Sequence, residues 1–95
     1  MMNAEVMRDA EQRRLAWRCR RGMLELDIVL QRFIAEQFGN LTLAEMQIFD
    51  EMLTLPDNEF WTLILSSDPT QQSPETQSVL VKLQTINMDY QREAM

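Results

Sequence analysis

Apolar residues recur at intervals of three and four along most of the chain, and this spacing limits the possible folds more than any other feature. The clearest stripe consists of four residues between positions 24 and 38: Leu26, Leu30, Phe33 and Ile34. No sustained alternation of apolar and polar residues indicates a strand, and the 95 residues include only two glycines. The spacing predicts an all-α fold, and the length favours one small helical domain spanning the whole chain.

Start and stop signals divide the chain into five predicted helices joined by short links, which is typical of a small helical bundle. The expected ranges are about 5–20, 24–38, 43–55, 58–65 and 74–90, with frayed ends at 1–4 and 91–95. Gly39 is expected to end the second helix in a left-handed conformation. Thr42 and Glu45 have the spacing of a capping box, and Asp57 is expected to cap the fourth helix.

The supply of chemically active side chains is small. There is one cysteine, Cys19, and no histidine, so an intramolecular disulfide and the usual zinc sites are excluded. No apolar run reaches the length of about 20 residues that spans a bilayer, and the first residues lack the apolar core of a signal peptide. We therefore expect a cytoplasmic protein that does not insert into a membrane, with few side chains from which an active site could be built.

Phosphate-binding loops are also missing, because the chain has neither a G-x-G-x-x-G nor a G-x-x-x-x-G-K-[ST] pattern. The isolated protein is thus expected to hold no nucleotide cofactor.

Charge is unevenly distributed along the chain: residues 1–32 carry seven Lys/Arg against five Asp/Glu, whereas residues 33–95 carry two Lys/Arg against ten Asp/Glu. This acidic body disfavours binding to nucleic acid, and any anion-binding face must lie near the N-terminus.

Five arginines crowd the end of the first predicted helix: Arg13, Arg14, Arg18, Arg20 and Arg21. At about 100° per residue they share an arc of roughly 160° that also contains Trp17, while Leu15 and Cys19 lie opposite. One interpretation is local: Gly22 ends the helix, the arginines complement the helix dipole, and Trp17 packs inward beneath their stems. The other is that arginine and tryptophan form a protein-binding face. The spacing leaves both open.

The segment "RGMLELD", residues 21–27, contains the pattern Arg-Gly-x-x-Glu and resembles the signature of the SdhE family of succinate dehydrogenase flavin-assembly factors. Three further features are similar: Trp17 upstream, the segment "IFDEML" at 48–53, and Asp57 followed by Phe60-Trp61. The resemblance covers roughly residues 10–90. Thr62 departs from it, since leucine is expected after the tryptophan.

The resemblance implies a five-helix, non-catalytic protein that binds the flavoprotein subunit of succinate dehydrogenase, and of the related fumarate reductase, and promotes covalent attachment of FAD to it. FAD would be the cofactor of that subunit, and the helper is expected to be a monomer. Partner binding is carried over to Arg21, Gly22 and Glu25, with Arg21 and Glu25 expected to be exposed. Flanking Trp17, Arg20 and Asp27 are added as candidates. The competing hypothesis is an antitoxin-like regulator that binds a toxin or nucleic acid through the arginine-rich first helix.

Overall fold

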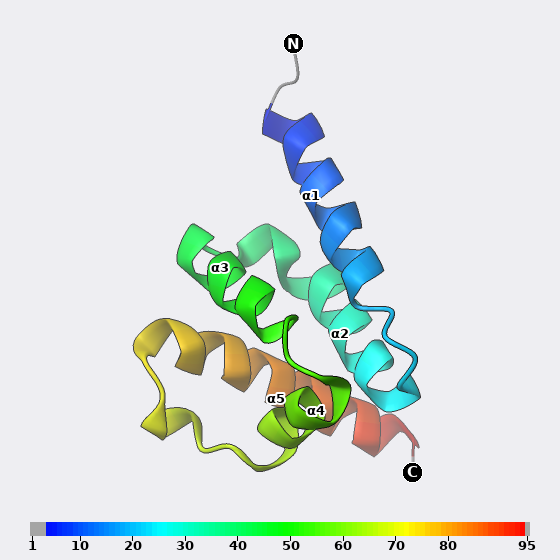
Figure 1. Ribbon diagram of the computed structural model, residues 1–95, viewed down its shortest axis with the longest axis vertical. Coiled ribbons are helices and arrows are strands. Elements are labelled where there is room, and N and C mark those ends of the chain that lie inside the picture. Colours follow the sequence, from blue (N-terminus) through cyan, green and yellow to red (C-terminus); the bar gives the residue numbers. More distant parts are fainter. Residues whose placement is uncertain (1–3, 95) are drawn as a thin grey trace.

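The computed structural model describes residues 4–94 and contains five α-helices and two short 3-10 turns (Figure 1). The elements are α1 (Ala4–Arg18), α2 (Leu24–Gln37), η1 (Phe38–Asn40), α3 (Leu43–Met52), α4 (Asp57–Ser66), η2 (Pro69–Gln71) and α5 (Pro74–Ala94). No strand occurs within this described range, which confirms the all-α prediction. Of the residues expected to be frayed, 1–3 and 95 lie outside the described part, residue 4 begins α1 and 91–94 continue α5, so fraying stays a prediction.

The long helix α5 lies at the centre of the helix contacts, because it packs against α2, α3 and α4. Helix α1 packs against α2. Figure 1 shows the N-terminal half of α1 extending beyond the other helices. The molecule measures 45 × 28 × 24 Å, and this extension lies along its longest dimension. None of the described helices is long and apolar enough to cross a membrane.

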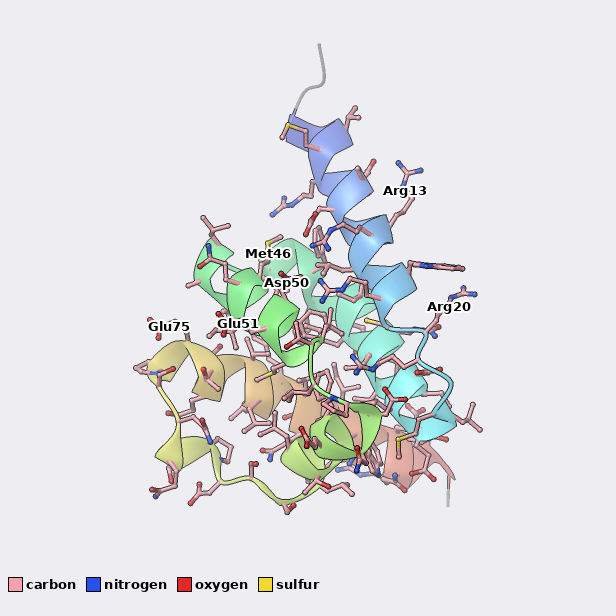
Figure 2. The ribbon with its side chains drawn as sticks, viewed as in Figure 1. Arg13, Arg20, Met46, Asp50, Glu51 and Glu75 are labelled. Carbon is pink, nitrogen blue, oxygen red and sulfur yellow. The ribbon has the colours of Figure 1, made fainter. Side chains whose placement is uncertain are left out.

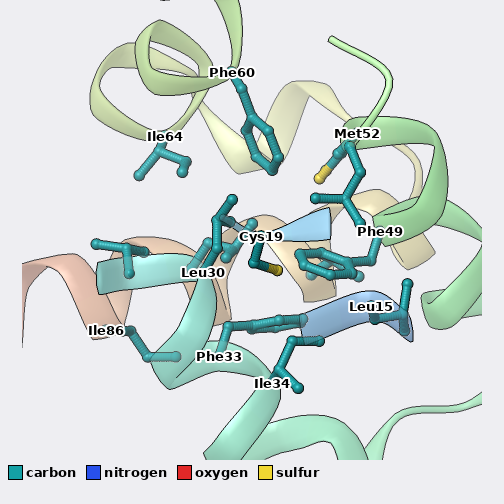
Figure 3. Packing of buried hydrophobic residues seen from close by; sticks show 14 of the residues in the cluster. Leu15, Cys19, Leu30, Phe33, Ile34, Phe49, Met52, Phe60, Ile64 and Ile86 are labelled. Atoms are coloured by element: carbon teal, nitrogen blue, oxygen red, sulfur yellow. The ribbon is translucent and has the colours of Figure 1, made fainter. Parts of the chain in front are cut away.

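The core forms where apolar stripes from all five helices meet (Figure 3). The rings of Phe33 and Phe49 lie with centroids 4.6 Å apart at its centre. Leu15 of α1 and Cys19, the residue after that helix, belong to the same cluster, as their position opposite the arginine arc predicted. Burying each large apolar side chain contributes about 1.5–3 kcal/mol, so these contacts supply most of the stability of such a small domain.

The predicted capping box at the start of α3 is confirmed. The Glu45 backbone N–H donates to Thr42 Oγ1 at 3.1 Å, and the Thr42 N–H donates to Glu45 Oε1 at 3.0 Å. Two N–H groups that an α-helix leaves unpaired are thereby satisfied by neighbouring side chains.

Several predicted helix ends are wrong. Helix α3 ends at Met52 and not at 55, and α5 continues past 90 to Ala94. Helix α1 ends at Arg18 instead of Arg20, and Gly22 therefore lies in the connecting loop. Gly39 does not adopt a left-handed conformation; within residues 4–94 only Gly22 has a positive φ, and α2 ends through the tight turn η1, in which the Leu41 N–H donates to the Phe38 carbonyl. Asp57 is the first residue of α4 and not its cap, because Pro56 occupies the N-cap position.

Candidate partner-binding site

The loop between α1 and α2 holds the Arg-Gly pair in a conformation fixed from the first turn of α2. One carboxylate oxygen of Asp27 accepts the Arg21 backbone N–H at 2.9 Å, and the other accepts the Gly22 N–H at 3.0 Å. Gly22 itself has a φ of +93°, a region that glycine enters without a steric penalty. Both oxygens of Asp27 are thus engaged within the chain, and its carboxylate shapes the turn.

The Arg21 side chain points into the protein. Its Nε donates to Asp57 Oδ1 at 2.5 Å, Nη1 donates to the Leu53 carbonyl at 2.7 Å, and Nη2 donates to the Leu55 carbonyl. The guanidinium also lies over the Phe60 ring, 5.6 Å from its centroid. Only 13% of the side chain is exposed, so the prediction that Arg21 is exposed is wrong. Arg21 joins the α1–α2 loop to the segment between α3 and α4.

Two further arginines of the predicted face form ion pairs with α3. Arg14 and Arg18 both bond the Asp50 carboxylate, and Arg14 also bonds Glu11 one helical turn earlier. Burial opposes ionisation of Asp50, but the two guanidinium groups outweigh it and hold the pKa of that carboxyl below its ordinary value. Three of the five arginines on the predicted arc are therefore committed to contacts inside the molecule.

Trp17 and Arg20 remain at the surface. The Trp17 side chain is 73% exposed, which contradicts the interpretation that it packs inward. The Arg20 guanidinium lies 5.9 Å from the Trp17 ring centroid, within the range of a cation–π contact. Figure 2 shows Arg20 and Arg13 projecting from the same side of the chain, away from the other helices.

A shallow groove of about 320 Å³ runs between α1 and α2 next to Arg20. Its lining combines short or apolar side chains with polar ones: Gln12, Arg13, Ala16, Arg20, Gln31, Ile34 and Ala35. Such a concave strip beside an exposed tryptophan is a suitable place for a protein segment to dock.

Glu25 is exposed on the first turn of α2, as predicted, and its carboxylate has no bonding partner among the residues that the structure describes. Gly22 is also exposed, and a Cβ atom added there would meet nothing within 4 Å. We call Trp17, Arg20, Gly22 and Glu25 the docking stretch, because they follow one another from the last turn of α1 to the first turn of α2. Four of the six candidate residues belong to it, while Arg21 and Asp27 support it from inside.

Sequence reasoning missed the partners of these arginines. Asp57 follows Arg21 by 36 residues and Asp50 follows Arg18 by 32, so no spacing along the chain connects them. Asp57 drew attention only as a helix cap and as part of the resemblance. Its neighbour Phe60 at i+3 in the same helix completes the surroundings of the Arg21 guanidinium.

The described residues offer neither a cluster of metal ligands nor a reactive thiol. No group of three or more His, Cys, Asp or Glu residues able to hold a metal ion occurs between residues 4 and 94. The Cys19 thiol is fully buried, and desolvation raises its pKa to about 12. The arrangement offers shape, charge and an exposed aromatic ring, which suit contact with another macromolecule.

Comparison with known proteins identifies the family. The family described as "Flavinator of succinate dehydrogenase" matches residues 13–87, which include the whole docking stretch and Asp57. The chain belongs to this family. The resemblance drawn from the Arg-Gly-x-x-Glu segment is thereby confirmed, whereas the roles of the individual residues stay predictions.

Three curated relatives of this flavinator-family chain are each named FAD assembly factor SdhE. The protein of Coxiella burnetii is 40% identical over 75 residues, covering 79% of this chain and 90% of its own length. That of Legionella pneumophila strain Lens is 44% identical over 62 residues, covering 65% and 78%. That of Aliivibrio fischeri is 46% identical over 55 residues, covering 58% and 64%. No solved structure gives a significant match.

Proposed function

We propose that this protein binds the flavoprotein subunit of succinate dehydrogenase and promotes covalent attachment of FAD to that subunit. The observation that carries the proposal is the family match over residues 13–87, together with relatives named as FAD assembly factors. We extend the proposal to the related subunit of fumarate reductase, on the basis of the family resemblance alone.

The docking stretch supplies the contacts that such binding requires. Gly22 lacks a side chain at an exposed turn, so a partner backbone can approach closely. Glu25 offers a carboxylate with no internal partner among the described residues, and can make a charge-assisted hydrogen bond across the interface. Trp17 and Arg20 are of the residue types that dominate binding energy at protein interfaces.

The proposed mechanism is selection of a reactive conformation. The flavoprotein subunit contributes FAD and the acceptor histidine, and this chain contains no histidine of its own. A helper that binds best to the conformer in which the two groups are aligned raises the population of that conformer. It then accelerates attachment by positioning, without serving as an acid, a base or a binding site for FAD. We propose that it works as a cytoplasmic monomer.

The ion pairs weaken the competing hypothesis of a toxin-binding or nucleic-acid-binding regulator. Arg14, Arg18 and Arg21 are engaged with Asp50 and Asp57, which leaves a smaller cationic surface than the sequence predicted. A nucleic-acid complex would also weaken steeply with added salt. Binding of the flavoprotein subunit is the function that the geometry supports better.

The test uses apo flavoprotein subunit produced in cells without an assembly factor. The subunit is incubated with FAD, with or without this protein, and covalent flavin is read from in-gel fluorescence after denaturation. We expect a clear increase when the protein is present, and a loss of that increase with Glu25→Ala. Flavin attachment that is equal with and without the protein would overturn the proposed function.

A further inference from the structure

We infer that Arg21, Asp27 and Asp57 form a clamp that sets the backbone of the docking stretch, so that Arg21 is a positioning residue and does not touch the partner. The inference rests on the proposed function, and it divides the Arg-Gly-x-x-Glu segment into an internal part and a contact part. Gly22 and Glu25 make the contact, and Arg21 acts through them.

All three nitrogen atoms of the Arg21 guanidinium already donate inward. Nε bonds Asp57 at 2.5 Å, Nη1 bonds the Leu53 carbonyl at 2.7 Å, and Nη2 bonds the Leu55 carbonyl. The carbonyls lie just after α3, where the helix leaves them without an intrahelical partner. A partner that recruited this guanidinium would have to break these bonds, whereas the neighbouring Arg20 is exposed and can be contacted at once.

The clamp holds the chain on both sides of the Gly22 turn. The Arg21 side chain is anchored to Asp57 at the start of α4, and its backbone N–H is anchored to Asp27 on α2. The second oxygen of Asp27 takes the N–H of Gly22 itself. Side chain and backbone of one residue thus connect α2 to α4, and the orientation of Gly22 follows from where these two helices lie.

The clamp also explains why Glu25 stays available. Both acids lie in the first turn of α2, where N–H groups and the helix dipole attract carboxylates. Asp27 accepts the two loop amides, and Glu25 has no bonding partner among residues 4–94. Because the Asp27 carboxylate accepts both loop N–H groups, the Glu25 carboxylate is left free for an intermolecular hydrogen bond.

The test compares Arg21→Lys, Asp57→Ala and the double variant at a temperature where melting curves show every protein folded. Lysine keeps the charge of Arg21 but lacks the planar fork that reaches three acceptors. We expect each single change to weaken binding to the flavoprotein subunit by about tenfold, and the double variant to be no weaker than the poorer single one. Lys82→Ala is the matched control, because it breaks a partly buried ion pair with Glu45 away from the loop.

The salt dependence of binding separates positioning from direct contact. Arg20→Ala is expected to reduce the effect of salt on affinity, while Arg21→Lys and Asp57→Ala weaken binding equally at low and high salt. Wild-type affinity in Arg21→Lys would show that the charge alone is sufficient and would overturn the clamp. Additive losses in the double variant would overturn it as well.

A second measurement needs no partner. Hydrogen exchange of the Arg21 and Gly22 amides is followed by NMR in the free protein, where release of the clamp should speed exchange about tenfold in Arg21→Lys and Asp57→Ala. Lys82→Ala should leave these two amides as slow as in wild type. Unchanged exchange in the clamp variants would overturn the inference. A wild-type protein that does not bind the flavoprotein subunit would overturn the proposed function, and the exchange rates would still decide the clamp.

Discussion

Arg20 and Arg21 are adjacent in the sequence but lie in different environments. Arg20 stacks against the exposed Trp17, whereas Arg21 crosses beneath the loop to reach Asp57. The difference arises because α1 ends at Arg18, so the loop backbone and not the helical rotation decides where each side chain points. A residue type that usually belongs to the surface can therefore support the fold at one position and stay exposed at the next.

Removing the Arg21 side chain should destabilise the protein, in contrast with the small effect expected for an exposed residue. Arg21→Ala leaves Asp57 and two carbonyl groups without their donor, which costs about 1–3 kcal/mol. Arg20→Ala should change the free energy of unfolding by no more than about 0.5 kcal/mol. Urea unfolding of both variants checks this, and equal stability of the two would contradict the internal role of Arg21.

Gly22 allows stability and function to be separated. Gly22→Ala should cost about 1 kcal/mol, because alanine at a φ of +93° is strained although space for its Cβ is open. Gly22→Glu should destabilise the protein by a similar amount, as measured by thermal melting. It should also abolish flavin attachment, because the glutamate side chain would extend into the partner.

Gly39→Ala is the matched control for Gly22. Space for a Cβ is equally open at Gly39, but its φ is not positive, so the change should leave both stability and flavin attachment near wild type. If the folded Gly22→Glu variant supports full flavin attachment, Gly22 is not part of the contact surface.

At the scale of helices, Glu45 connects the start of α3 to α5. Besides closing the capping box, its other carboxylate oxygen accepts bonds from Lys82 Nζ at 2.8 Å and from the Ser78 hydroxyl at 2.6 Å. Lys82, Ser78 and the Thr42 backbone N–H together lower the pKa of Glu45 from 4.5 to about 2. One side chain thus caps the start of α3 and holds that helix against α5.

The Glu45–Lys82 ion pair should make the free energy of unfolding depend on pH in the acid range. Because the pKa of Glu45 is lower in the folded state, its contribution is complete above about pH 4.5 and is lost as the pH falls toward 2. Glu45→Gln should therefore lower the free energy of unfolding by about 1–2 kcal/mol at pH 7 and by much less at pH 2. Chemical denaturation at several pH values measures this difference. In a Lys82→Ala background the substitution should have a smaller effect, and an unchanged effect there would show that Lys82 is not the main cause.

At the scale of the whole molecule, the packed helices fix the position of the docking stretch. The core fixes α2 and α4 relative to each other, and the clamp carries that geometry to the loop between α1 and α2. The charge separation predicted from the sequence is modified by the fold, since Asp50 and Asp57 of the acidic part neutralise arginines of the basic part. The cations left on the outer side include Arg13 and Arg20.

The isolated protein should be a monomer without bound FAD. The chain has only two glycines and no phosphate-cradling loop, so tight binding of FAD alone is not expected. Gel filtration with light scattering, monitored at flavin wavelengths after incubation with FAD, checks both statements. A yellow peak with one FAD per chain would contradict the proposal that FAD is held by the flavoprotein subunit.

The sequence by itself determined the local structure and the family. Apolar spacing gave five helices, the pair Thr42 and Glu45 gave a capping box three residues apart, and Arg-Gly-x-x-Glu pointed to the flavinators. Each of these signals lies within a few residues of chain, where backbone geometry alone decides which groups meet.

Only the tertiary structure decided which candidate residues are exposed and which are held inside the molecule. Arg21 meets Asp57 across 36 residues, and Arg18 meets Asp50 across 32, because α3 and α4 fold back against the end of α1. A helical wheel that continued to Arg21 placed all five arginines on one face, but the helix stops at Arg18 and the face divides. The side chains follow contacts between distant segments, and no spacing along the chain encodes those contacts.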